Sequence, residues 1–422
     1  MPDTYYEYTA NKQPECPSLA GEVQVDVCVV GAGFTGLGVA LELARKGYSV
    51  VVLEAMKIGF GASGRSGGQV ASGYAAGMIE AARIVGAEDA AKLWAFSERA
   101  KIILKDRIET GTIDCGFQDG ELYAAPKSSH MDWLRTEKDF VETQYGYAHY
   151  RWIDQSGIRS LLAGERYVGG LLDLQGGHLH PLNYTLGLAR LALATGARIF
   201  ERSAMLDYTV TDNKVMVRTA QGQVRAETLV LAGNAYLKKR APSLQRRALV
   251  AKSSILATAP LGQERAQALM RTTACVADTN YDLDYFKMSS DYRLIYGGQD
   301  LSFGRSSLQD SAIRRNMLKT FPALEDVAID YMWSGDLSIT HKRLPDIGRI
   351  GSHVYYAHGY SGQGVSLSAV ISEILAEAIS GDMARMDVFG RISHTEIPKS
   401  QMIRLPVYYS LLLWHRLKDA LA

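Results

Sequence analysis

The fold is decided by the stretch VDVCVVGAGFTGLGVALELARKGYSVVVLE at residues 25–54. Val25–Val30 is a nearly continuous apolar run, as expected of a strand buried on both faces, and Ser49–Leu53 is a second such run. Between them, Leu37–Arg45 has the composition of a helix that Gly47 would end. A strand, a helix and a second strand in this order form a βαβ unit, which requires the two strands to be parallel.

The turn between the first strand and the helix carries the motif GAGFTG at residues 31–36. Gly31 permits the tight turn, Gly33 lets a pyrophosphate approach the backbone, and Gly36 lets helix and strand pack closely. The N-terminus of the helix then faces the phosphates with free N–H groups. Glu54, at the end of the second strand, is placed to accept hydrogen bonds from a ribose 2′-hydroxyl. We therefore predict a dinucleotide site that disfavours a 2′-phosphate.

Two further glycine-rich loops favour FAD over NAD as the dinucleotide. The loop at 61–69 (GASGRSGGQ) follows Glu54 too closely to be a separate nucleotide site, so it would run over the same cofactor. The loop at 359–364 (GYSGQG) opens the last long helix. Its N–H groups would point at an electron-rich edge, such as that of a flavin that gains negative charge on reduction.

Bulk properties limit the remaining possibilities. A chain of 422 residues is too long for one simple core, and 46 basic against 45 acidic residues give no support for a nucleic-acid surface. Four cysteines without CxxC spacing suit buried thiols in a reducing compartment, and we expect no metal site. With no stretch long enough to span a bilayer, we predict a cytoplasmic protein. Leu405–Leu421 is expected to pack as a terminal helix, with contact to a membrane surface as the alternative.

The order of apolar runs predicts an α/β fold in two interleaved parts. Val354–Ala357 reads as a last buried strand of the parallel sheet, whereas Tyr285–Met288 and Leu294–Tyr296 flank a polar turn, as in an antiparallel pair. We predict a Rossmann-like FAD-binding domain of the glutathione-reductase type and an interleaved antiparallel-sheet substrate domain. The first would cover about 22–110, 160–250 and 335–395, the second about 111–159 and 251–334, and a tail 396–422.

These motifs, together with LVLAGNAY (229–236) and YYAHGYSGQGVSLS (355–368), resemble the D-amino-acid-oxidase-type flavoproteins, which include glycine oxidase and sarcosine oxidase. The resemblance covers nearly the whole chain. GGHLHPLNY (176–184) and LDYFKMSSDYRLIYGG (283–298) are specific to closer relatives, and within the family the chain is most similar to enzymes that oxidise γ-glutamylputrescine. The resemblance implies FAD, a substrate stacked against the flavin, and hydride transfer from the carbon next to nitrogen.

The resemblance also implies which residues contact FAD. They are Gly31, Ala32, Gly33, Phe34, Thr35, Gly36, Glu54, Ala55, Gly61, Ala62, Ser63, Arg65, Ser66, Gly67, Gly68, Gln69, Ala232, Gly233, Asn234, Gly359, Tyr360, Ser361, Gly362, Gln363, Gly364 and Val365. Relatives tether their flavin through a cysteine in the later part of the chain or through a histidine near the first motif. Here no cysteine lies from Thr279 onward and no histidine lies between Asp26 and Gln69, so we expect noncovalent FAD.

Two positions depart from the family pattern for gripping an α-carboxylate. The arginine of glycine oxidase matches Leu337 here, and the lysine of sarcosine oxidases matches Ser366. A buried carboxylate without a cation is costly, so we predict an amine substrate in place of an α-amino acid. Asp336, beside Leu337, would attract an ammonium group; the alternative is an ordinary acid at a strand end.

The residues expected to position the substrate are Gln69, Tyr285, Asp336, Tyr360 and His341, with His180 and Tyr281 as further wall candidates. No strong base is required, because the reacting amine must already be neutral. Arg343 would hold a distal carboxylate such as a γ-glutamyl group, or would pair with Asp346 at the surface.

Three functions follow. The favoured one is oxidation of γ-glutamylputrescine or a related polyamine derivative, with hydride transfer to flavin, an imine that hydrolyses to an aldehyde, and oxygen or another electron acceptor. The second is a flavin oxidase or dehydrogenase of a secondary or cyclic amino acid such as L-pipecolate, which needs a cation to replace those lost at Leu337 and Ser366. The third is a flavin-binding subunit whose catalysis depends on a partner.

Overall fold

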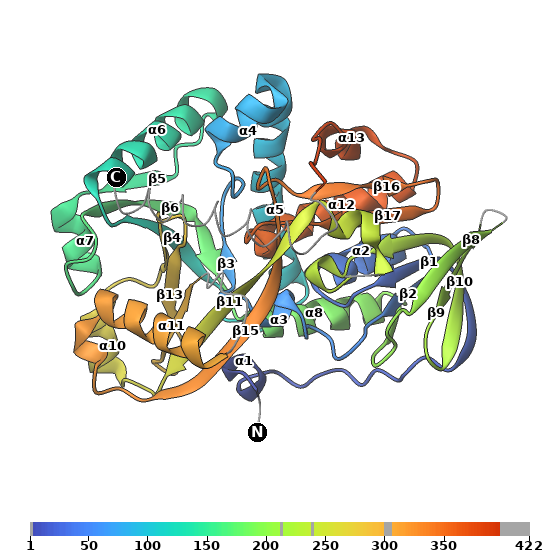
Figure 1. Ribbon diagram of the computed structural model, residues 1–422, viewed down its shortest axis with the longest axis horizontal. Helices are drawn as coiled ribbons and strands as arrows, with labels where there is room; N and C mark the ends of the chain where they lie inside the picture. The colour runs from blue at the N-terminus through green and yellow to red at the C-terminus, as the bar shows by residue number, and fades with distance from the viewer. Residues whose placement is uncertain (1–2, 212–213, 238–239, 299–305, 397–422) are drawn as a thin grey trace.

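The computed structural model describes residues 3–211, 214–237, 240–298 and 306–396, and it consists of two sheets with helices packed on their outer faces (Figure 1). The predicted terminal helix at 405–421 lies outside the described residues. Besides the helices packed on the two sheets, the structure contains α1 (Tyr5–Tyr8), α3 (Ala62–Arg65), α4 (Met78–Val85), α6 (Ser128–Tyr145), α9 (Pro242–Gln245) and α13 (Ala384–Gly390), with 3-10 turns η1 (Asn234–Tyr236) and η3 (Pro322–Leu324).

The first sheet contains the predicted βαβ unit, which is confirmed. Strand β1 (Gly21–Val30) pairs in parallel with β2 (Val50–Leu53) on one side and with β10 (Gly222–Leu231) on the other, and α2 (Phe34–Arg45) connects β1 to β2. The strand order is β16 (Asp346–Ile350), β17 (Val354–His358), β10, β1, β2, β7 (Arg198–Phe200). Strand β9 (Lys214–Arg218) also pairs antiparallel with β10, and β8 (Asp207–Thr211) pairs antiparallel with β9. The short apolar runs at 223–226 and 228–231 form the single strand β10.

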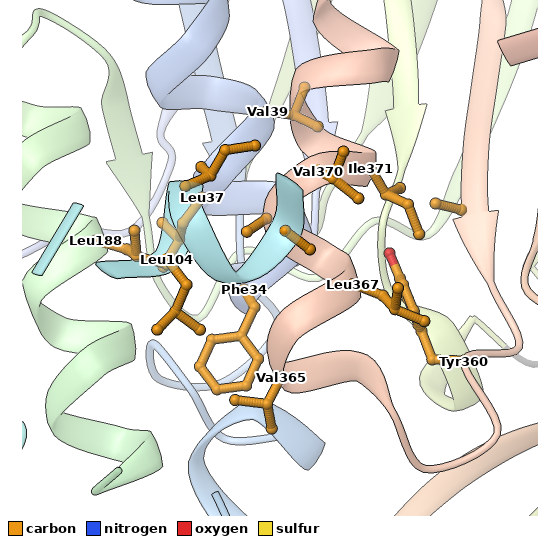
Figure 2. Close-up of a cluster of buried hydrophobic side chains, with 14 of the residues drawn as sticks. Phe34, Leu37, Val39, Leu104, Leu188, Tyr360, Val365, Leu367, Val370 and Ile371 are labelled. Carbon is orange, nitrogen blue, oxygen red and sulfur yellow. The ribbon is translucent and has the colours of Figure 1, made fainter. Parts of the chain in front are cut away.

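Four helices pack together on one face of this sheet. They are α2, α5 (Ala87–Thr110), α8 (Pro181–Ala194) and α12 (Gly364–Ile379). Figure 2 shows Leu37 of α2, Leu104 of α5, Leu188 of α8 and Val370 of α12 in one cluster, and all four are fully buried. Each such side chain stabilises the fold by roughly 1.5–3 kcal/mol. The packing therefore fixes two helix N-termini, those of α2 and α12, relative to the first sheet.

The second sheet is antiparallel, as predicted, except that β4 and β12 run parallel. Its strand order is β15 (Ile329–Thr340), β11 (Ala248–Thr258), β14 (Leu294–Gly298), β13 (Asp284–Met288), β12 (Cys275–Asp278), β4 (Gln118–Ala125), β6 (Gly169–His178) and β3 (Gln69–Val70), with β5 (Tyr150–Ile153) also paired to β6. Helices α7 (Gln155–Leu161), α10 (Gln263–Leu269) and α11 (Ser306–Thr320) cover one of its faces.

Side chains alternate between the two faces of the second sheet, as the period of a strand requires. On β4, Leu122 and Ala124 enter the core beneath the covering helices, whereas Glu121 and Tyr123 face the opposite side. On β13, Phe286 enters the same core and Tyr285 faces away from it. The uncovered face is therefore mixed in polarity, and it is the face that is turned toward the first sheet.

Two of the predicted domain boundaries do not agree with the strand pairing between distant segments. Strand β6 and the second half of β15 lie in segments assigned to the first domain, yet both pair in the second sheet. We therefore propose that 169–178 and 329–340 go with the substrate part. The region 78–110, expected to be one long helical stretch, is divided into α4 and α5 at Gly86, whose φ is +83°.

In the described part of the chain, no single helix combines the length and apolarity needed to cross a membrane. One pair, α12 with α13, passes by length and composition together, but it is bent by 114° at the break. The four cysteines are buried and free.

Candidate FAD and substrate site

A cavity of about 1200 Å³ lies between the two sheets. Pockets for small ligands usually measure roughly 300–1,000 Å³, so this cavity has room for a cofactor together with a substrate. Its walls come from the three glycine-rich loops, from the uncovered face of the second sheet and from helix α6.

The first glycine loop is built so closely that no side chain fits at two of its positions. Gly31 has a φ of +110°, and a Cβ added there would lie 3.0 Å from the carbonyl oxygen of Ala232 on the next strand. A Cβ on Gly36 would lie 1.9 Å from the carbonyl oxygen of Gly31. Gly36 does not line the cavity, so it shapes the turn from behind. The backbone N–H of Phe34 donates to the hydroxyl oxygen of Ser63 over 3.0 Å, which ties the first loop to the second.

Glu54 lies at the cavity wall at the end of β2, where the sequence placed it. Its Oε2 accepts a hydrogen bond from the N–H of Ala32 over 2.8 Å, and its Oε1 accepts one from the N–H of Met56 over 2.9 Å. Burial raises the pKa of this carboxyl above its usual value, while the backbone donors oppose that shift. The carboxylate is thus oriented by the backbone toward the position expected for the ribose.

The second loop is pressed against the second sheet. Gly68 has a φ of +73°, and a Cβ there would lie 2.1 Å from the carbonyl oxygen of Leu179. A Cβ on Gly67 would lie 2.7 Å from the ring of Tyr285. The Nε of Arg65 donates to the carbonyl of Phe60 over 2.9 Å. This loop therefore bridges the two sheets, with little room for side chains along the cavity wall.

The third loop is held to the first by a buried hydrogen bond. The hydroxyl of Tyr360 lies 2.7 Å from that of Thr35 on α2, and the N–H of Gly359 donates to the side-chain oxygen of Asn234 over 3.1 Å. Tyr360 therefore holds this loop and also lines the cavity, and its contact with a substrate stays a prediction. Gly359, like Gly36, does not line the cavity.

The residues present fit an FAD. Among the described residues, Ser66 Oγ and Gln363 Oε1 are buried without a hydrogen-bond partner, and both side chains lie at the cavity wall. Gly362 has a φ of +103° and open space where a Cβ would point. Helices α2 and α12 begin at the cavity without side-chain caps, so their first N–H groups suit anionic or electron-rich groups. Apart from Gly36 and Gly359, every residue predicted to contact FAD lines this cavity.

The predicted substrate-positioning residues also line the cavity, with different bonding. Gln69 Nε2 donates to the carbonyl of Val276 over 3.0 Å, and the Tyr285 hydroxyl lies 2.9 Å from that of Ser253. Both are therefore fixed on the sheet face. His341 is exposed at the cavity wall.

Two of the predicted polar groups have partners within the protein. Asp336 lines the cavity and pairs with Lys252, its direct partner across the β11–β15 ladder, over 3.2 Å; its role toward an ammonium stays a prediction. His180 does not line the cavity and caps α8, accepting from the N–H of Asn183 over 3.1 Å. Burial lowers the pKa of His180 to about 3, so it is neutral and structural.

The two positions that lack the family's cations differ in their placement. Leu337 lines the cavity, whereas Ser366 is buried behind it and donates its hydroxyl to the carbonyl of Ala71 over 3.0 Å. Of these two positions, Leu337 is therefore the one where a lost carboxylate-binding cation would change the cavity.

Arg343 is a cation at the cavity wall that lies over an aromatic ring. Its guanidinium lies 4.0 Å from the ring centroid of Tyr281, and both residues line the cavity. The alternative pairing with Asp346 does not form, because Asp346 binds His358 over 2.8 Å. Arg343 has a φ of +53°, an uncommon backbone conformation for a residue with a side chain, and such strain is concentrated at functional sites.

Sequence reasoning missed a group of polar residues on β4 and α6. Glu121 and Tyr123 of β4 line the cavity, as do His130 and Trp133 of α6. The available signal was an acidic residue directly before the apolar run LYAA (122–125), since a buried carboxylate there requires a reason.

Comparisons with known proteins agree with this geometry. A family model described as FAD dependent oxidoreductase matches residues 26–378. The chain is 38% identical over 417 residues to the γ-glutamylputrescine oxidoreductase of Escherichia coli K12, covering 97% of each chain. It is 41% identical over 392 residues to a probable oxidoreductase of Haemophilus influenzae, covering 92% of this chain and 90% of the other.

Solved structures share the fold. Glycine oxidase from Bacillus cereus superposes with a TM-score of 0.72 at 19% identity, covering 89% of this chain and 100% of the other. L-proline dehydrogenase from P. horikoshii gives 0.69 at 20% identity, covering 86% and 94%.

Proposed function

This chain belongs to the family of FAD-dependent oxidoreductases, and from that premise we propose that it oxidises the C–N bond of a small amine, γ-glutamylputrescine or a related polyamine derivative. The observation that carries the proposal is the placement of one arginine. Leu337 lines the cavity where a carboxylate grip would stand, whereas Arg343 lines it beside Tyr281.

The position of Arg343 suits a carboxylate that is remote from the reacting carbon. Tyr281 lies in the loop between β12 and β13, whereas Tyr285, four residues later, packs against Gly67 of the loop expected at the flavin ring. No carboxylate among the described residues pairs with Arg343. A guanidinium binds carboxylates in a two-pronged geometry, so Arg343 is suited to the carboxylate of a γ-glutamyl group.

Hydride transfer from a neutral amine requires little acid–base catalysis by the protein. Bound FAD supplies the acceptor for the hydride that leaves the carbon next to nitrogen. Gln69 and Tyr285, both fixed by hydrogen bonds, form a rigid wall that orients the substrate in a space shielded from water. Loss of hydride and a proton converts the amine to an imine, and water then releases an aldehyde and ammonia. We further propose noncovalent FAD, a cytoplasmic location and oxygen or another electron acceptor.

Anaerobic stopped-flow reduction of the holoenzyme tests the proposal. We expect γ-glutamylputrescine to bleach the flavin absorbance rapidly, putrescine and spermidine to do so less efficiently, and D-alanine, sarcosine and L-pipecolate to leave it unchanged. Rapid bleaching by L-pipecolate or D-alanine would contradict the interpretation of Leu337. A protein fully loaded with FAD that no amine reduces would favour the partner-dependent subunit.

We expect Arg343→Gln to raise KM for γ-glutamylputrescine by roughly 10- to 100-fold, because hydrogen bonds to a charged group contribute about 1.5–3 kcal/mol. The KM for putrescine, which has no carboxylate, should not change. Steady-state kinetics with both substrates measures the difference. Arg349→Gln, which removes an exposed arginine of β16, is the matched control and should affect neither substrate. An equal loss for both substrates in Arg343→Gln would show that this arginine is structural.

A further inference from the structure

A buried carboxylate on the cavity floor has unused hydrogen-bonding capacity. Glu121 of β4 is 2% exposed and lines the cavity. Its Oε2 accepts a hydrogen bond from the hydroxyl of Tyr123 over 2.9 Å, and this is its only hydrogen bond within the described residues. An ionised carboxylate can accept about four hydrogen bonds, and burying it without a partner is costly. The remaining capacity of Glu121 is therefore available to a cationic group inside the cavity.

The neighbouring network does not neutralise this carboxylate. The buried ammonium of this network, that of Lys101, lies 2.9 Å from Glu98 and donates to the hydroxyl of Ser72 over 2.5 Å. That hydroxyl in turn donates to Asp173 over 2.5 Å. Lys101 is thus bound between Glu98 and the Ser72–Asp173 pair, and Glu121 is left outside its hydrogen bonds.

Burial raises the pKa of Glu121 to about 8, with a smaller contribution from the charge of Asp173, while the Tyr123 hydroxyl and Lys101 act in the opposite direction. The titratable groups that face Glu121 come from each packed element: Tyr123 on its own strand, Asp173 on β6, Tyr150 on β5, Cys275 on β12 and Lys101 on α5. None of these groups forms a charged hydrogen bond with the free carboxylate oxygen of Glu121. A ligand ammonium is the missing partner.

Glu121 also lies close to the loop expected at the flavin ring. A Cβ built on Gly176 would lie 2.8 Å from the Cβ of Glu121 and 3.2 Å from the carbonyl oxygen of Val70, the residue that follows Gln69. Glu121 pairs with Cys275, three residues before the Asp278–Ala124 pair at the end of the ladder. At about 3.3 Å per residue, it lies roughly 10 Å further into the sheet than the strand end that leads to Tyr281 and Arg343.

We propose that Glu121 anchors the amino end of the substrate and takes up its excess proton. This inference rests on the proposed function and deepens it. When the ammonium reaches Glu121, one N–H bond breaks, one O–H bond forms on the carboxylate, and the nitrogen keeps the electron pair; nothing is oxidised or reduced in this step. The product is the neutral amine that C–H oxidation requires. Glu121 and Arg343 then select substrates with an amine at one end and a carboxylate at the other.

The first test measures binding without turnover. tert-Butylamine has no hydrogen on its α-carbon and cannot be oxidised, and tert-butanol is its neutral counterpart. Titrated into the holoenzyme and followed by the flavin difference spectrum, tert-butylamine should bind Glu121→Gln roughly 10- to 100-fold more weakly than wild type, whereas tert-butanol should bind both equally. Asp119→Asn, which removes an exposed carboxylate from the same strand, should behave as wild type.

Folding of the variant is checked by its thermal midpoint, which we expect to be unchanged or higher, because the amide still accepts the Tyr123 hydroxyl and no charge is buried. Glu121→Asp, which keeps the charge but shortens the reach, should give intermediate affinity. Equal binding of tert-butylamine by wild type and a folded Glu121→Gln would overturn the inference.

A pH profile gives a second readout that a purely structural role would not move. Because the folded pKa is about 8, the carboxylate form increases as pH rises through 8, so kcat/KM of the wild type should rise across this range. Glu121→Gln should lose this limb and keep only ionisation of the substrate amine near about 10. Failure of γ-glutamylputrescine as a substrate, with weakened tert-butylamine binding in Glu121→Gln, would refute the proposed substrate and leave the anchor standing. Retention of the limb in the variant would refute the anchor.

Discussion

Replacing Gly36 with alanine should abolish FAD binding and prevent the first sheet from forming correctly. The added Cβ would lie 1.9 Å from the Gly31 carbonyl oxygen and 3.2 Å from a side-chain carbon of Val29. Since the nearest atom is backbone, no side-chain rotation relieves the clash, and the cost will exceed the roughly 1–3 kcal/mol of ordinary overpacking. The ratio of flavin to protein absorbance and the thermal midpoint of the purified variant measure both effects.

Gly390→Ala is the control for this experiment. Gly390 ends α13, its φ is in the ordinary range, and a Cβ there meets nothing within 4 Å. We expect it to retain FAD and stability. A Gly36→Ala protein that purifies yellow with a wild-type midpoint would show that α2 can move away from β1, contrary to the close packing described above.

Arg166→Met is expected to destabilise the protein by about 3–5 kcal/mol, the usual cost of leaving buried charges without their partner. The guanidinium of Arg166 lies 3.0 Å from Asp278 and 2.7 Å from Asp284, whose side chains are 0% and 2% exposed. Both aspartates lie where β12 and β13 leave the sheet toward Tyr281. Chemical denaturation with urea measures the loss, and we expect weaker substrate binding to accompany it.

The direction in which the stability loss of Arg166→Met changes with pH can also be predicted. Burial already raises the pKa of Asp278, and removal of the guanidinium will raise it further. A raised carboxyl pKa lowers stability above the unfolded value of about 3.9, so the difference between Arg166→Met and wild type should grow from pH 5 to pH 8. Arg218→Met removes an exposed pair with Asp207 and should leave the stability nearly unchanged at either pH. A variant that loses no more than this control would contradict the charge argument.

The sequence predicts those parts of the molecule whose chemistry is local. The turn after β1 requires glycine at Gly36 because a Cβ there would meet the Gly31 carbonyl five residues away, and at Gly31 because of its φ of +110°, so the motif alone reveals the βαβ unit. Apart from Gly359, the residues of the other glycine loops that are predicted to contact FAD also line the cavity, although their contact with FAD stays a prediction. The prediction of a parallel sheet beside an antiparallel one is confirmed for the same reason.

What the sequence could not reveal depends on pairing between distant segments. Strand β6 lies beside β4 because of a register that links Leu172 with Leu122, fifty positions away, and no local pattern encodes that choice. Glu121 reaches the cavity only because this pairing sets which face of β4 is uncovered. Likewise, His180 looks like a candidate for the substrate wall, yet its partner Thr9 lies in a distant N-terminal segment that encloses it.

The pairing of β1 with β10 has a consequence for biosynthesis. These strands are hydrogen-bonded neighbours, yet almost half of the chain separates Val30 from Gly222. At translation rates of about 5–20 residues per second, the first strand waits on the order of 10–40 s on the ribosome before its neighbour emerges. The third glycine loop appears later still, at residue 359. A nascent chain therefore cannot enclose FAD until residue 359 has been made, and until residue 222 emerges the apolar strand β1 lacks its neighbour β10.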